Sequence, residues 1–102
     1  MVLAVTRLFD EDMPHCSPMQ RAKGAPTVFV NGRPWSREFD PNTVHLKPNP
    51  TPPPECIPHQ TVIIKGAPTV YPQGPPAGSI FKPLGPDQCT TTGKGSMNVF
   101  CP

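Results

Sequence analysis

A five-residue word that occurs twice is the feature that most limits what this chain can fold into. Gly-Ala-Pro-Thr-Val stands at residues 24–28 and again at residues 66–70, 42 positions later. A weaker third copy, Gly-Ser-Met-Asn-Val-Phe, occupies residues 95–100. Self-similarity of this kind is typical of repeat architectures, in which each unit buries its apolar face against its neighbours. We therefore expect three similar units.

A second element repeats with a different offset. Val-Thr-Arg-Leu-Phe-Asp at residues 5–10 resembles Trp-Ser-Arg-Glu-Phe-Asp at residues 35–40, and residues 77–82 stand in the same place in the next copy. The shift of 30 positions between the first two also carries His15 onto His45. Each unit is thus predicted to send a soft metal ligand into the loop after its second strand.

The local sequence of each unit predicts a β-hairpin. Residues 27–30 are β-branched or aromatic and favour a strand. Asn31-Gly32 suits a type I′ turn, because both residues tolerate positive φ, and residues 35–39 are expected to return as the partner strand. In the second unit Gln73-Gly74 takes the turn position, and Pro72 makes that hairpin shorter or places it at an edge.

The third unit is divided between the two ends of the chain. Residues 97–100 are expected to supply its first strand and residues 3–9 its second. This division would bring the ends together and close a ring of three hairpins.

A proline-rich loop separates two of the histidines. Residues 47–58 read KPNPTPPPECIP, with six prolines in twelve positions. Such a run is expected to exclude both helix and sheet pairing and to favour extended polyproline geometry. No segment of the chain has a helical pattern of useful length.

Composition narrows the class of protein. With 102 residues, the chain is expected to form a single domain over positions 1–102. Its 18 prolines and 8 glycines approach a disordered composition, but 16% charged and 35% hydrophobic residues favour a folded, loop-rich β domain. A net charge of +2 without a basic stripe gives no support to nucleic-acid binding. We identify neither a signal peptide nor an apolar run of the roughly 20 residues that span a bilayer.

The cysteines and histidines point to metal binding. Four cysteines allow three connectivities of two disulfides, but without a secretory signal they are more often thiols or metal ligands. All of the histidines lie close to a cysteine or in the same kind of loop. The residues concerned are Cys16, Cys56, Cys89 and Cys101, with His15, His45 and His59.

These patterns resemble the PAAR-repeat family, whose name comes from a Pro-Ala-Ala-Arg word. Pro-Trp-Ser-Arg at residues 34–37 fills that position, with degenerate copies at residues 76–79 and 4–7. Gly-Ala-Pro-Thr-Val-Phe-Val-Asn-Gly at residues 24–32 is very similar to the family's most recognisable string. The likeness extends over essentially the whole chain, but residues 76–79 lack the arginine and the loop before His59 is longer than usual.

The resemblance implies a mostly β fold and a mechanical function. The expected fold is a small cone with pseudo-threefold β-hairpin units, a broad base and one structural zinc near its apex. The family sits as a monomer on a trimeric β-helical spike, at the tip of a phage tail or of a type VI secretion apparatus that stays in the cytoplasm until ejection. It sharpens the spike for membrane penetration and can carry effector cargo. Carried over by motif, the zinc ligands would be His15, His45, His59 and Cys89.

Physical chemistry supports a zinc ion in such a cone. Loops that converge on a point bury little apolar area, whereas ordering each residue costs about 1–2 kcal/mol. A tetrahedral zinc contributes roughly 10–16 kcal/mol of apparent binding free energy in structural zinc peptides. A closed shell of four ligands leaves no position for a reactive water, so this site would be structural. Among the cysteines, Cys56 and Cys16 are the alternatives to Cys89 as the ligand, and Cys101 is expected to pack near the base.

The hydrophobic residues are expected to form a core and a base. Phe9, Phe39 and Phe81 occupy equivalent positions and are expected to pack together as the small core. Trp35 suits either the core or the base. An apolar base that receives the spike would include Val28, Val30, Val70 and Tyr71.

Two other functions compete with the spike tip. A small metal-dependent hydrolase would use the His/Cys cluster, but it needs an open coordination site and a base, and the nearest acids, Glu55 and Asp87, lie in no recognised motif. A proline-rich ligand for SH3-like or WW-like partners would use residues 48–54. The expected protein is not an enzyme.

Overall fold

The computed structural model of the chain describes residues 2–14, 16–48, 56–85 and 90–102. Within these ranges the regular structure is mostly β, as the sequence predicts, and consists of two-stranded antiparallel sheets without a helix. No helix in the described residues has the length and apolarity needed to cross a membrane. The strands are β1 (Leu3–Ala4), β2 (Phe29–Val30), β3 (Arg33–Pro34), β4 (His45–Pro48), β5 (Cys56–His59), β6 (Val62–Ile63), β7 (Leu84–Gly85) and β8 (Phe100–Cys101).

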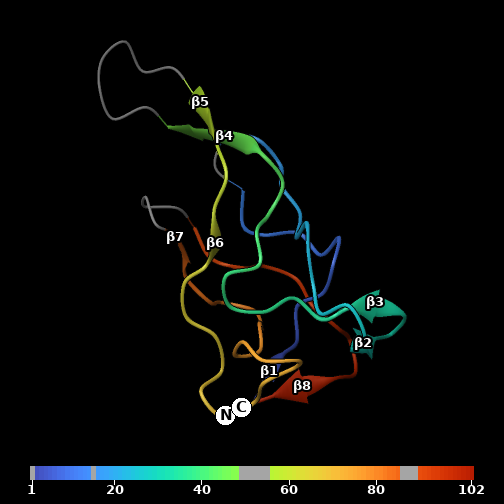
Figure 1. Cartoon of the computed structure of the whole chain (residues 1–102). Helices are drawn as coiled ribbons and strands as arrows, with labels where there is room; N and C mark the ends of the chain where they lie inside the picture. Colours follow the sequence, from blue (N-terminus) through green and yellow to red (C-terminus); the bar gives the residue numbers. More distant parts are fainter. Residues whose placement is uncertain (1, 15, 49–55, 86–89) are drawn as a thin grey trace.

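The molecule is elongated, with principal extents of 43 × 23 × 23 Å. The β4–β5 hairpin lies at one end, which we call the hairpin end (Figure 1). Both chain termini lie at the other, together with β1, β8, β2 and β3 (Figure 1), and we call this the termini end. The predicted metal site therefore lies toward the hairpin end, and the predicted apolar base lies at the termini end.

The two ends of the chain pair with each other. β1 and β8 are antiparallel, with Leu3 opposite Cys101 and Ala4 opposite Phe100. The backbone N–H of Val5 donates to the carbonyl of Val99 at 3.1 Å, which extends this pairing by one residue. The predicted meeting of the termini is confirmed, although the strands are shorter than expected.

The predicted Asn-Gly turn is also confirmed. β2 pairs with β3 so that Val30 lies opposite Arg33, and the turn residues Asn31 and Gly32 have φ values of 54° and 81°. Positive φ at both central residues is the property that defines a type I′ turn. The predicted bounds of the partner strand, residues 35–39, are wrong: β3 is Arg33–Pro34, because a two-residue turn leaves no room for a longer connection.

Three backbone hydrogen bonds form a closed ring in the interior. The N–H of Ser36 donates to the carbonyl of Thr6 at 3.0 Å, that of Gly78 to Ser36 at 2.8 Å, and that of Thr6 to Gly78 at 3.3 Å. Each residue comes from the same position of the second repeated element. All three are buried, so the ring fixes the repeats to one another where water does not compete.

The repeated glycines allow the backbones to approach closely around this ring. In each copy of the GAPTV word, the residue after the glycine donates a backbone hydrogen bond of 2.8 Å: Ala25 to Trp35, Ala67 to Ala77, and Ser96 to Val5. A Cβ atom added to Gly66 would lie 2.7 Å from the carbonyl oxygen of Ala77, and one added to Gly95 would collide with the carbonyl of Val5. Glycine is therefore the residue that this contact requires.

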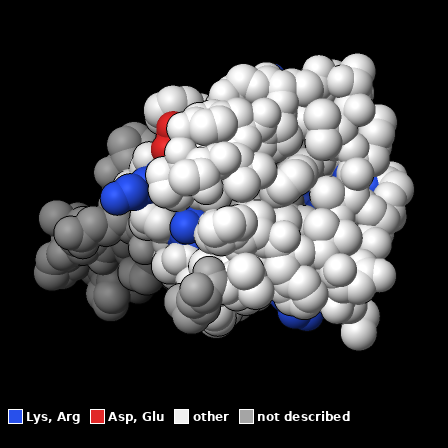
Figure 2. Space-filling model, turned by 90° about the horizontal axis from the view of Figure 1, so that it is seen from below, with Lys and Arg blue, Asp and Glu red and all other residues white. Residues whose placement is uncertain are grey.

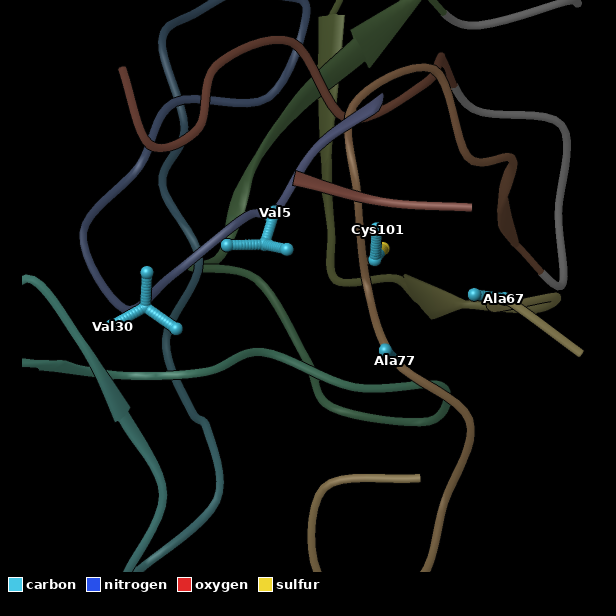
Figure 3. Packing of buried hydrophobic residues seen from close by; sticks show 5 residues of the cluster. All are labelled: Val5, Val30, Ala67, Ala77 and Cys101. Carbon is cyan, nitrogen blue, oxygen red and sulfur yellow. The ribbon is translucent and has the colours of Figure 1, made fainter. Parts of the chain in front are cut away.

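The hydrophobic core is small and lies in two clusters. The first contains Val5, Val30, Ala67, Ala77 and Cys101 (Figure 3), against which the half-buried Trp35, Val70 and Val99 pack. The packing role predicted for Cys101 is confirmed, since its side chain is 3% exposed. Val30 belongs to this core and not to the base surface where it was expected. The second cluster is formed by Met19, Ile63 and Leu84.

The three equivalent phenylalanines are not the core, and this prediction is wrong. Phe9, Phe39 and Phe81 are 59%, 66% and 58% exposed, and their φ values are 71°, 70° and 63°. In the first two repeats the N–H of the next residue, Asp10 or Asp40, donates back across the turn to the carbonyl three residues earlier. Phenylalanine thus stands at the turn position that favours glycine or asparagine, and its side chain points away from the interior.

This backbone conformation leads to a stability prediction for Phe39. We expect Phe39→Asn to raise the free energy of unfolding by about 0.5–1 kcal/mol, because the left-handed region is costly for a bulky side chain and readily adopted by asparagine. Phe29→Asn is a matched control, since Phe29 is 56% exposed but lies in β2 with an ordinary, negative φ. Urea denaturation of both variants would measure the difference. A loss of stability in Phe39→Asn would show that the side chain makes contacts that outweigh the strain.

The two ends of the proline-rich loop form a sheet ladder, contrary to the prediction. β4 and β5 pair with Pro48 opposite Cys56, Lys47 opposite Ile57 and Leu46 opposite Pro58. Among the described residues this sheet has two strands, so each has an edge without a strand partner there, where the missing N–H of a proline breaks no ladder. Residues 49–55 lie outside the described part of the chain.

Candidate functional site

Two of the four predicted zinc ligands lie in the described part of the chain, and the fold brings them together. His45 begins β4 and His59 ends β5, and the two are directly opposite each other in the sheet register. Their rings pack edge to face, with centroids 4.2 Å apart. His15 and Cys89 lie outside the described residues, so the complete ligand set stays a prediction.

A hydrogen bond to the backbone orients the ring of His45. His45 is 3% exposed, and its Nδ1 lies 2.8 Å from the carbonyl oxygen of Thr43. A carbonyl only accepts hydrogen bonds, so this contact places the ring proton on Nδ1 and makes Nε2 the nitrogen with a lone pair. Fixing one imidazole nitrogen through a carbonyl is the usual way in which proteins orient a metal-binding histidine.

A buried ion pair lies among the residues that pack near the histidines. Nη1 of Arg21 donates to Oδ2 of Asp12 at 2.8 Å, and both side chains are completely shielded from solvent. Arg21 also donates to the hydroxyl of Ser36 and to the carbonyl of Asp40. The amide of Asn42 donates to the same carboxylate oxygen of Asp12 at 3.2 Å. A network of polar groups thus lies in the place where an apolar core would be expected.

Burial dominates the titration of Asp12. It raises the pKa of this carboxyl, and the opposing effects of Arg21, Asn42 and His45 are smaller. Its second oxygen, Oδ1, is buried without a hydrogen-bond partner among the described residues. Asp12 therefore carries a destabilising charge that Arg21 and Asn42 only partly compensate.

The structure excludes the two alternative cysteine ligands in their present state. Cys16 and Cys56 are joined by a disulfide, with their Cα atoms 6.1 Å apart. Sulfur in a disulfide is not a thiolate, and thiolate is the form that binds zinc. The expectation that these cysteines are free thiols or ligands is therefore wrong, because the β4–β5 pairing brings Cys56 next to the segment that contains Cys16. Cys101 is a free thiol, whose pKa is raised by burial.

The described residues contain two of the four predicted zinc ligands, His45 and His59. No group of three or more His, Cys, Asp or Glu side chains suited to a metal ion occurs among them. Two neighbouring imidazoles fit zinc by donor type, and the predicted partners, His15 and Cys89, would complete a closed shell with nitrogen and sulfur donors. The donor chemistry is compatible with a structural ion.

The termini end carries a second candidate site, made of three exposed aromatic residues. Phe29, Tyr71 and Phe100 are 56%, 57% and 53% exposed. Each follows a valine whose carbonyl accepts an equivalent backbone hydrogen bond: Val28 from Trp35, Val70 from Ala77 and Val99 from Val5. The aromatics therefore occupy matching places in the three repeats. Tyr71 was expected on this surface, but Phe29 and Phe100 were not.

The face around these aromatics has few charged side chains. Figure 2 shows the molecule from the termini end, and lysine, arginine, aspartate and glutamate cover only a small part of the visible surface. Met97, which is 94% exposed, and Val2, which is 62% exposed, add further apolar area. The indole N–H of Trp35 donates to the carbonyl of Gly78 at 2.9 Å, which fixes this ring against the core behind the face.

Sequence reasoning missed the buried ion pair, the disulfide and two of the three aromatics. A signal for the aromatics existed, because the 42-residue shift that aligns the GAPTV words also aligns Phe29 with Tyr71. For the ion pair no such signal existed, since the same shift places Arg21 on the apolar Ile63.

The comparisons with protein families and with curated proteins assign this chain to no family. No protein-family model matches the sequence. No curated protein matches it significantly.

Proposed function

We propose that this chain caps a trimeric β-helical spike of a contractile injection machine, as a pseudo-threefold cone of the PAAR-repeat type. The spike would be the central spike of a phage tail or its counterpart in type VI secretion. In this proposal the termini end is the base that docks on the spike and the hairpin end is the tip. A structural zinc would hold the tip through His15, His45, His59 and Cys89.

One observation carries the docking proposal. Phe29, Tyr71 and Phe100 occupy equivalent places in three repeats that a ring of backbone hydrogen bonds holds together. A single chain with three matching contacts can meet three identical subunits in the same way, which is what a trimeric partner offers. Exposed aromatics on a weakly charged face are also the residues that dominate protein interfaces.

Co-purification with a trimeric β-helical spike fragment tests this function. We expect the native chain to bind one trimer, and the variant Phe29→Asp, Tyr71→Asp, Phe100→Asp to bind at least about 100-fold more weakly, because truncated interface anchors typically cost 2 kcal/mol or more each. Binding would be measured by titration calorimetry or interferometry.

The exposed phenylalanines elsewhere on the molecule provide the matched control. Phe9→Asn, Phe39→Asn, Phe81→Asn removes an equal number of aromatics of similar exposure that lie outside the proposed base. This variant is expected to bind the spike as the native chain does. Equal loss in both variants, or no binding of the native chain to any such trimer, would contradict the proposed docking surface.

A further inference from the structure

We propose that the Cys16–Cys56 disulfide is a reversible redox clamp, which fixes the β4–β5 hairpin to the rest of the molecule. The bond connects residues 40 positions apart in the sequence. Cys56 is the first residue of β5 and is exposed, and Cys16 is half-buried. An accessible disulfide at the surface is the kind that small thiols and disulfides reach and exchange with.

The hairpin needs such a clamp. In the described part of the chain, β4 and β5 pair only with each other, and an isolated two-stranded hairpin is marginally stable in water. Beside Cys16, the N–H of Leu46 donates to the hydroxyl of Ser17 at 2.9 Å. Leu46 itself is 37% exposed, so it contributes little apolar burial. The disulfide adds a covalent attachment at this point of the hairpin.

A low-molecular-weight disulfide such as oxidised glutathione can serve as the oxidant that forms the Cys16–Cys56 bond. The thiolate of one cysteine attacks the glutathione disulfide, which forms a mixed disulfide and releases one glutathione as thiolate. The thiolate of the second cysteine then attacks the protein sulfur of the mixed disulfide. The Cys16–Cys56 bond forms, and the second glutathione leaves. Overall, two protein thiols are oxidised and one glutathione disulfide is reduced to two thiols.

Cys101 is not expected to take part in this exchange. Cys101 is 3% exposed in the first core cluster, close to β1 at the opposite end of the molecule. Opening the clamp is therefore expected to loosen the hairpin end locally and to leave the termini end folded.

Hydrogen exchange of the full chain, measured by mass spectrometry, tests the clamp. We expect reduction by a phosphine to speed the exchange of amides in β4 and β5 by roughly 10-fold or more, with amides of β1 and β8 unchanged. Oxidised glutathione should restore the slow exchange. Cys16→Ser, Cys56→Ser should exchange rapidly at the hairpin in either condition, since it cannot form the bond.

Three results would overturn the proposal. The first is equal hairpin exchange in the oxidised and reduced chain. The second is faster exchange at both ends on reduction, which would mean that the bond supports the whole fold. The third is peptide mapping that finds Cys16 and Cys56 as separate thiols after equilibration with oxidised glutathione. None of these measurements depends on the spike, and repeating them with and without a chelator separates the clamp from the zinc that the proposed function places at His45 and His59, so the two proposals can fail separately.

Discussion

Arg21→Met is expected to lower the free energy of unfolding by about 3–5 kcal/mol at pH 7, because it leaves the carboxylate of Asp12 buried without its counter-ion. Such a loss is a large part of the roughly 5–15 kcal/mol that a domain of this size retains. Both side chains of the pair are fully buried, so water cannot replace the lost partner. Thermal unfolding followed by circular dichroism should show a fall in Tm of more than about 10 °C.

The pH dependence of this variant identifies the cause. Burial already raises the pKa of Asp12 in the native chain, and removal of Arg21 takes away the main group that opposes this shift. The folded pKa of such a carboxyl lies above its unfolded pKa of about 3.9. Its contribution to the free energy of unfolding is fully present when the pH is below the unfolded pKa, where the carboxyl is protonated. This contribution is lost as the pH rises through the folded pKa. The deficit of Arg21→Met should therefore be smaller near pH 4 than at pH 7.

A double variant serves as the control. Asp12→Leu, Arg21→Ile installs the residues that stand at the equivalent positions of other repeats, namely Leu84 and Ile63. Replacing both members of a buried ion pair by apolar residues is often neutral or stabilising. The double variant should thus be more stable than Arg21→Met. If Arg21→Met alone melts like the native chain at pH 7, the pair contributes nothing and the packing described here is wrong.

Removal of zinc is expected to have the second large effect. Under the proposed function, metal analysis of the purified protein should give about one zinc per chain. Chelation should lower Tm strongly, because structural zinc contributes roughly 10–16 kcal/mol of apparent binding free energy. His59→Ala should lose the metal and the thermal stability together, since a shell with three remaining ligands no longer closes.

Val44→Ala is the matched control for the zinc experiment. Val44 precedes His45, is 66% exposed and has no metal-binding atom in its side chain. Its substitution should leave zinc content and Tm close to those of the native chain. Retention of zinc in His59→Ala, with unchanged melting, would remove His59 from the ligand set.

The repeat could be predicted from the sequence, because it rests on local signals. The Asn31-Gly32 turn and the meeting of the two chain ends follow from residue type and spacing. The proximity of His45 and His59 was expected only through the resemblance to a zinc-binding family. The structure places them together for a local reason, which is the register of β4 and β5.

Other features could not be predicted, because they depend on what surrounds a residue. Phenylalanines at equivalent positions suggested a core, but the turns that they occupy direct them outward. Arg21 and Asp12 look like surface charges in the sequence, and only the assembled fold encloses them. The Cys16–Cys56 bond required the register of the β4–β5 ladder, which the prolines had argued against.

The pairing of β1 with β8 has a consequence for how the molecule acquires its shape. Leu3 finds its partner only when Cys101 has been made, so the third repeat cannot close before its last strand has been synthesised. Contacts between such distant residues slow folding, because a long loop must close before they form. Nascent chains that stop before residue 95 should accordingly be more sensitive to protease at the third repeat than chains that contain residues 95–101.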